Sequence, residues 1–262
     1  MAKEETYDTE FYSFVNKTSR KKEITAIVKI VHGFIGDVDR VIDFGCGLGQ
    51  WLSVFKEFGA SKVTGVDGDY VDRNRLYINA DEFMPYDLSN FIDLNQKYDL
   101  AISIETAEHL TKDKAKTFVD TLCAHSDVIL FAAAIPYQGG TYHANEQFPS
   151  YWAKLFSQNG YVCLDCIRPE IWYNDKIEIW HKQNIMLYVK SGSELFGKLC
   201  PPSLFSRFPT PLDIIHPELQ LRRINEFWIN EDFHSVGNML KVLRIIVSKL
   251  ISAPFKALRK KG

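Results

Sequence analysis

The segment of this chain best suited to binding a small molecule is a turn with glycine at three alternate positions, Gly45, Gly47 and Gly49. Glycine lets the backbone turn sharply and approach a ligand closely, because it has no Cβ. Asp67 lies about 20 residues further on, at the end of the next apolar segment. A carboxylate at that place can accept hydrogen bonds from both hydroxyls of a ribose. The spacing therefore predicts a nucleotide-like ligand.

The class of nucleotide follows from Gln50 and Asp43. A dinucleotide-binding turn has a further glycine where this chain has Gln50, so that a helix N-terminus can meet a pyrophosphate. Asp43 stands in the same turn, and its carboxylate would repel a diphosphate but attract an ammonium group or another cation. A glycine-rich turn alone is common in α/β proteins, and the two acids Asp43 and Asp67 favour a cofactor that carries a positive charge.

A second group of polar residues, Glu105, Glu108 and His109, follows the apolar segment 98–104. If a helical turn begins near Ile104, the three side chains share one face, as in a proton relay or a metal site. We favour the alternative in which Glu108 and His109 only orient the loop. The dense cluster of acids that an oxygen-ligand site needs is absent from this region of the sequence, so we expect no bound metal.

Apolar segments alternate with segments of helical periodicity along most of the chain, which predicts an α/β fold with a mainly parallel sheet. Strands are expected at residues 40–43, 62–67, 98–104, 127–135, 161–167 and 184–189, with the third strand at either 76–78 or 83–86. Helices are expected at residues 19–36, from residue 50 to Gly59, at 112–123 with Thr111 as the cap, and at 149–159. In such sheets ligands bind beyond the carboxyl ends of the strands, where the polar residues above would lie.

The glycine turn and four further segments resemble one family, the class I S-adenosylmethionine-dependent methyltransferases. The segments are Gly-Val-Asp-Gly-Asp-Tyr70, Pro-Tyr-Asp-Leu88, residues 98–110 and residues 139–149. The similarity spans about residues 11–190 and is most specific toward methyltransferase domains found among bacterial glycan and lipopolysaccharide biosynthesis genes. It implies a Rossmann-like sheet of seven strands, parallel except for an antiparallel last strand. Residues 1–190 would form the methyltransferase domain, and residues 191–262 an extension, irregular at first and then helical.

The resemblance also implies S-adenosylmethionine as the cofactor and indicates which residues hold it. Asp87 would accept a hydrogen bond from the exocyclic amine of the adenine, while Leu88 would cover the ring; alternatively, Asp87 only caps the turn that ends at residues 89–90. Glu105 would touch the cofactor or the acceptor. The expected cofactor-binding residues are Asp43, Gly45, Gly47, Gly49, Asp67, Gly68, Asp87, Leu88 and Glu105.

Residues 136–149, after the fifth strand, are too polar for the core and carry a pair of glycines, which is typical of a loop over a binding site. Methyl transfer to a hydroxyl requires removal of a proton. We predict His143 as the general base, because the ordinary pKa of histidine, about 6.5, suits this task, and Glu146 as the residue that orients its ring or binds acceptor hydroxyls. Alternatively, both residues only fix the loop to the next helix. The predicted catalytic residues are thus His143, Glu146 and Glu105.

Composition is consistent with a cytoplasmic enzyme. The chain has 262 residues, of which 46% are hydrophobic, and its net charge of −2 excludes the basic footprint of a nucleic-acid-binding protein. No N-terminal signal peptide is recognisable. The number of cysteines is odd, and Cys163 and Cys166 would lie on opposite faces of a strand, so we expect reduced thiols and no metal or redox site.

Residues 238–262 contain seven basic residues and no acid. On a helical wheel the basic positions gather on one side and the apolar positions mainly on the other, which predicts an interfacial helix. We expect it to lie on an anionic inner membrane leaflet. The alternative is a helix that docks on the enzyme's own core or on a second subunit. The sequence does not determine the oligomeric state.

The predicted activity is methyl transfer from S-adenosylmethionine to a hydroxyl of a glycan or of an activated or lipid-linked sugar. The sequence leaves open two alternatives. One is a methyltransferase of small metabolites or natural products, which the basic C-terminal segment would not obviously serve. The other is a binding module that keeps the cofactor fold without catalysis.

Overall fold

A computed structural model of the chain describes residues 18–199 and 212–230. The chain divides into two compact units, one that ends at His216 and one that begins at Pro217. In the second unit the structure describes one helix, α10 (Pro217–Asn230), in which Arg222 and Glu218 form an ion pair one turn apart. The predicted amphipathic helix at residues 238–262 lies outside the described residues. Within the described ranges, none of the helices combines the length and the apolar content that a bilayer crossing requires.

The first unit is built on a seven-stranded sheet with the strand order β3-β2-β1-β4-β5-β7-β6. Strand β7 is antiparallel to both of its neighbours, and the other strands run parallel to one another, which confirms the predicted fold class. The strands are β1 (Arg40–Phe44), β2 (Lys62–Asp67), β3 (Phe83–Pro85), β4 (Leu100–Ile104), β5 (Val128–Ala132), β6 (Tyr161–Leu164) and β7 (Met186–Lys190).

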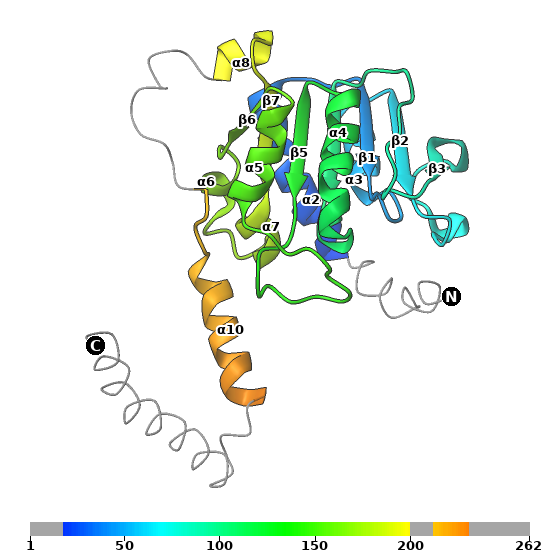
Figure 1. The fold of residues 1–262 in the computed structure, drawn as a ribbon. Helices are drawn as coiled ribbons and strands as arrows, with labels where there is room; N and C mark the ends of the chain where they lie inside the picture. The colour runs from blue at the N-terminus through cyan, green and yellow to red at the C-terminus, as the bar shows by residue number, and fades with distance from the viewer. Residues whose placement is uncertain (1–17, 200–211, 231–262) are drawn as a thin grey trace, which may run out of the picture. The chain divides into compact units, whose positions relative to one another are not determined.

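Helices cover both faces of this sheet (Figure 1). Side chains alternate between the faces of a strand, and each set packs in its own apolar core. Helices α2 (Thr18–Ile35) and α3 (Gln50–Glu57) pack on the core that contains Val41, whereas α4 (Ala115–His125) and α5 (Pro149–Gln158) pack on the core that contains Ile42. Three shorter helices complete the unit: α6 (Arg168–Ile171), α7 (Ile179–Asn184) and α8 (Glu194–Leu199).

Most predicted elements are present, with four differences in detail. The third strand is the later of the two alternatives, β3. Asn184 ends helix α7 and does not begin the last strand, which starts at Met186. A 3-10 turn, η4 (Lys112–Lys114), precedes α4, and the Thr111 side chain makes no capping hydrogen bond to it. Strand β6 ends at Leu164, so that Cys166 lies beyond it.

The first unit extends past the predicted domain limit at residue 190, because residues 212–216 pack against it. Arg168 donates to the carbonyl of Leu212, and Asp213 accepts two hydrogen bonds from Ser150. Gln183 donates to the carbonyl of Ile214 and accepts from the amide of His216. None of the described cysteines, Cys46, Cys123, Cys163 and Cys166, forms a disulfide.

Candidate active site

The predicted site residues lie at one end of the sheet, where β1, β2, β4 and β5 have their carboxyl ends. The chain order reverses between β1 and its neighbour β4. Such a switch point leaves a crevice outside the strand ends, because the connections on its two sides run in opposite directions. The glycine turn follows β1, Glu105 follows β4, and the loop 136–149 follows β5, and these three strands are parallel, so all three segments lie at this end of the sheet.

The glycine turn requires glycine at all three predicted positions. Gly45, Gly47 and Gly49 have φ angles of 90°, 53° and 80°, in the left-handed region that other residues rarely adopt. The amide of Gly45 donates to the carbonyl of Val66 at 2.8 Å, which joins the turn to β2. A Cβ at Gly45 would lie 2.1 Å from Oγ1 of Thr106, so the turn also packs directly on the segment after β4. Helix α3 then begins at Gln50, as predicted.

Asp67 ends β2 and is buried, with both carboxylate oxygens engaged. One oxygen accepts from the amide of Gly47 at 2.7 Å, and the other from the amide of Gly68 at 2.7 Å and from the hydroxyl of Tyr70 at 2.6 Å. Burial raises the pKa of Asp67 above its usual value, although these hydrogen bonds oppose the shift. The Tyr70 hydroxyl is the partner that a ribose hydroxyl could replace, because the other two donors are backbone amides of the turn.

Asp43 lies beneath the turn and is 2% exposed. Its Oδ1 atom is buried and has no hydrogen-bond partner among the described residues. Burial, followed by the charge of Asp67, raises the pKa of Asp43 well above its usual value. An unpartnered carboxylate oxygen next to a second acid fits a ligand that brings positive charge or N–H donors, as the sequence predicted for the cofactor.

Asp87 and Leu88 follow β3, but Asp87 makes the local contacts of the alternative interpretation. Its carboxylate accepts from the amide of Ser89 at 3.0 Å and from the side chain of Asn90 at 3.2 Å, and so caps the turn. Asp87 is exposed and Leu88 is buried. Contact of this pair with an adenine stays a prediction.

Glu105 directly follows β4 and is held by two side chains that the sequence analysis did not single out. Gln138 donates to one carboxylate oxygen and Asn184 to the other, each at 2.8 Å, and Asn184 also donates to Gln138. Burial raises the pKa of Glu105. Its φ of 53° is left-handed, which costs a non-glycine residue about 1 kcal/mol and occurs mainly at functional sites. No sequence pattern indicated Asn184 as a site residue, because residues 184–189 were predicted to form the last strand and Asn184 instead ends helix α7.

The expected helical turn after β4 is a 3-10 turn, η3 (Ala107–His109), that begins beyond Glu105. Glu105, Glu108 and His109 therefore do not share one face of a helical turn, as was predicted. Glu105 and Glu108 nevertheless lie close enough to interact. Glu108 is completely buried, and burial followed by the charge of Glu105 raises its pKa well above the usual value. The His109 ring packs edge-on against the ring of His143, with centroids 4.9 Å apart.

The loop 136–149 places His143 and Glu146 together, as predicted. Nδ1 of His143 lies 2.9 Å from a carboxylate oxygen of Glu146. Glu146 also accepts from the amides of Tyr137 and Gly139, and so holds the loop together internally and does not fix it to the next helix by these contacts. The amides of residues 144 and 145 donate to the carbonyl of Glu108, which docks the loop on η3. The contact with Glu146 leaves Nε2 of His143 for other chemistry.

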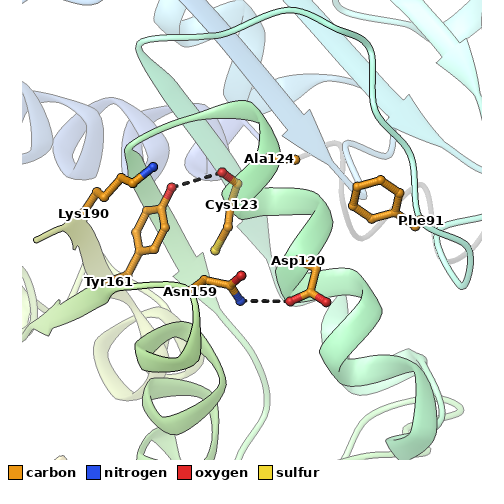
Figure 2. Close-up of a pocket in the computed structure, with 7 residues that line it drawn as sticks. All are labelled: Phe91, Asp120, Cys123, Ala124, Asn159, Tyr161 and Lys190. Atoms are coloured by element: carbon orange, nitrogen blue, oxygen red, sulfur yellow. Dashed lines mark hydrogen bonds between the residues drawn. The ribbon is translucent and has the colours of Figure 1, made fainter.

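A hollow of about 320 Å³ lies apart from the predicted site residues (Figure 2). It is lined by Phe91, Asp120, Cys123, Ala124, Asn159, Tyr161 and Lys190. Tyr161 begins β6, and β5 begins shortly after the end of α4, so this hollow lies at the amino ends of these strands. It contains none of the predicted site residues. Its polar groups serve the fold: Asn159 donates to Asp120, and the Tyr161 hydroxyl to the carbonyl of Cys123.

Comparisons with known proteins agree with the geometry. The model of a family described as a methyltransferase domain matches residues 15–164. Two similar solved structures are DesVI from Streptomyces venezuelae and SAM-bound CalS10, an amino pentose methyltransferase from Micromonospora echinaspora. The alignment with DesVI has a TM-score of 0.53 at 14% sequence identity and covers 71% of this chain and 98% of the DesVI chain. The alignment with CalS10 has a TM-score of 0.51 at 14% sequence identity and covers 70% of this chain and 95% of the CalS10 chain. At such identities the likeness concerns the fold alone. A comparison with curated protein sequences finds no match.

Proposed function

Because the chain belongs to the methyltransferase-domain family, we propose that it transfers a methyl group from S-adenosylmethionine to a hydroxyl of a glycan or of an activated or lipid-linked sugar. The observation that carries the proposal is that the glycine turn with its acids and the polar loop with its histidine lie at the same end of the sheet. The glycine turn with Asp43 and Asp67 lies after β1 and β2, and the polar loop with His143 and Glu146 lies after β5.

The cofactor would bind across the glycine turn. Asp67 would accept from the ribose, and the unpartnered Asp43 would compensate positive charge on the methionine half. CalS10, which shares the fold, is described with bound SAM. When bound, the cofactor supplies a methyl group on a sulfonium, which any aligned nucleophile can attack.

The protein must align the acceptor and remove its proton. In the proposed step the acceptor oxygen bonds to the methyl carbon, the carbon–sulfur bond breaks, and the hydroxyl proton passes to Nε2 of His143. Glu146, on Nδ1, would hold the ring in place and stabilise its protonated form. Glu105, held by Gln138 and Asn184, would contact the acceptor or the cofactor.

A sugar acceptor is supported by two tyrosines on the same loop. Tyr137 and Tyr142 are 83% and 67% exposed, and both have left-handed φ angles, 67° and 60°. Exposed aromatic rings held in a strained backbone are typical of a binding surface, and the apolar face of a sugar ring can pack on them. CalS10, which has a similar fold, is an amino pentose methyltransferase, which is consistent with this class of acceptor.

The proposal is tested with purified protein, labelled S-adenosylmethionine and candidate glycans and sugar nucleotides. We expect His143→Ala to lower kcat by about 10²–10⁴-fold, because it removes the base. Affinity for S-adenosylhomocysteine should stay unchanged. Glu146→Gln keeps an acceptor for the imidazole and should cost less. A fully active His143→Ala variant would exclude this base, and cofactor binding without activity on any acceptor would favour the non-catalytic module.

We also propose that the basic segment 238–262 holds the enzyme at an anionic membrane, where a lipid-linked acceptor would be found. Its seven basic residues and absence of acids support this. The full chain should float with liposomes that contain anionic lipid, and more weakly at high salt. A chain that ends at residue 237 should stay in the soluble fraction; equal flotation of both chains would remove the proposal.

A further inference from the structure

Three side chains with metal-binding atoms meet at the candidate active site. One ligand atom each from Glu108, His109 and His143 lies within 4.8 Å of the others. They come from two segments, η3 and the loop after β5, that backbone hydrogen bonds to the Glu108 carbonyl hold together. The cluster thus depends on the docked loop.

Glu108 provides a second and independent indication. It is 0% exposed, and neither of its carboxylate oxygens has a hydrogen-bond partner among the described residues. A buried carboxylate without a partner is strongly unfavourable unless it is neutralised or binds a cation. The carboxylate of Glu105 lies close enough to interact with it and adds a second acid. A cation bound where the two imidazoles converge would compensate the charge of this buried acid.

We propose that Glu108, His109 and His143 bind a divalent transition-metal ion, with Glu105 as a second carboxylate beside it. Two imidazoles among the ligands favour Mn²⁺, Fe²⁺, Co²⁺ or Zn²⁺ over Mg²⁺ and Ca²⁺, which prefer oxygen ligands alone. Glu146 engages Nδ1 of His143, so we assign Nε2 to the ion. A carboxylate on the distal nitrogen is the usual support of a metal-binding histidine. No metal was expected from the sequence, because the region after β4 lacks the dense cluster of acids that an oxygen-ligand site needs.

The cation site is argued from the cluster alone, whereas its role rests on the proposed function. An ion held by three protein side chains keeps open positions, which hydroxyls of the acceptor can occupy. The ion would then lower the pKa of the acceptor hydroxyl itself. With the ion bound, His143 would be a ligand in place of the base, and the hydroxyl proton would pass to Glu105. Binding of Mn²⁺ by the wild type therefore decides between these two roles of His143.

The test is Mn²⁺ binding by full-length protein freed of metal with a chelator, with free Mn²⁺ measured by electron paramagnetic resonance. The wild type should bind one Mn²⁺ per chain. Glu108→Gln and His109→Ala should each weaken binding by at least about tenfold. Glu82→Gln is the control, since it alters a largely covered carboxylate that pairs with Lys56 and contacts no residue of the cluster, and it should bind Mn²⁺ as the wild type does.

S-adenosylhomocysteine binding by each variant, measured separately, reports whether the fold is intact and separates this proposal from the cofactor assignment. If Glu108→Gln does not fold, His143→Ala decides, because it changes a loop residue at the edge of the cluster. Wild-type protein that binds S-adenosylhomocysteine but no Mn²⁺ would overturn the site. So would folded variants at Glu108 and His143 with wild-type affinity for Mn²⁺.

Discussion

At the scale of single residues, Gly45 is the most sensitive position of the glycine turn. Alanine there would adopt a φ near 90° and place its Cβ against the side chain of Thr106. We expect Gly45→Ala to destabilise the fold by about 1–3 kcal/mol, from backbone strain and overpacking. Affinity for S-adenosylhomocysteine should fall by more than about tenfold, since the displaced turn can no longer approach the ligand. Urea unfolding and calorimetric titration measure the two effects.

Gly33 offers the matched control, because it lies inside α2 with no atom within 4 Å of an added Cβ. Gly33→Ala should keep the ligand affinity and stabilise the chain by up to about 1 kcal/mol, since alanine is the better helix former. Equal loss of affinity in both variants would show that the effect does not come from the turn.

How much of the site the sequence could predict depends on how local each contact is. The glycine turn and Asp67 were predictable, because the turn's own amides hold this carboxylate. Gln138 and Asn184 were not, because their contacts with Glu105 join three elements far apart in sequence. The approach of His109 and His143 depends in the same way on a docked loop, which no spacing reveals.

At the scale of elements, one buried pair ties the N-terminal helix to the active site. Glu23 of α2 accepts from Nδ1 of His181 at 2.6 Å and from the amide of Glu178 at 2.7 Å. His181 belongs to α7, whose last residue, Asn184, holds Glu105. The contact between Glu23 of α2 and His181 therefore helps to place Asn184, and through it the Glu105 side chain after β4.

The Glu23 pair predicts a dependence of stability on pH. Burial raises the pKa of Glu23, but hydrogen bonds from His181 and the Glu178 amide outweigh it and leave the pKa below its usual value. The carboxylate thus contributes stability above the unfolded-state pKa, about 4.3, and loses it as pH falls through the folded-state pKa. Glu23→Gln should destabilise the protein by about 1–3 kcal/mol at pH 7. The difference from wild type should shrink below about pH 4.

Chemical denaturation across this pH range checks the sign. Glu57→Gln is the control, because it removes the partner of Lys21 from an exposed ion pair and should change stability little at any pH. A loss in Glu23→Gln that stays the same from pH 7 down to about pH 3 would contradict the assignment.

The elements themselves followed from periodicity, and the exceptions have local causes. β2 was predicted to the residue, since Gly59 marks the turn before it and the acid Asp67 marks its end. β3 has three residues at the sheet edge, too few for a periodic signal, so two segments competed for it. The turn after β4 was predicted as helical, but the left-handed Glu105 delays the start of η3. Tertiary contacts of Glu105 thus override the local pattern.

At the scale of the whole molecule, the sheet order explains why distant segments share one site. The switch between β1 and β4 brings the carboxyl ends of β1, β2, β4 and β5 to the same end of the sheet, while two apolar cores hold the sheet from both faces. The residues proposed to bind the ligand thus follow buried strands. Ligand binding should consequently stabilise the whole first unit, and not only the loop that covers the site.

This coupling can be measured as a thermal shift. S-adenosylhomocysteine at 100 times its Kd should stabilise the folded chain by about 2.7 kcal/mol. At about 2–4 °C per kcal/mol for a chain near this size, Tm should rise by roughly 5–10 °C. Glu23→Gln should lower Tm yet keep this ligand-induced rise, because Glu23 lies outside the glycine turn, whereas Gly45→Ala should lose most of it. An equal rise in Tm for Gly45→Ala would show that the ligand binds elsewhere, since this variant alters the glycine turn and Glu23→Gln does not.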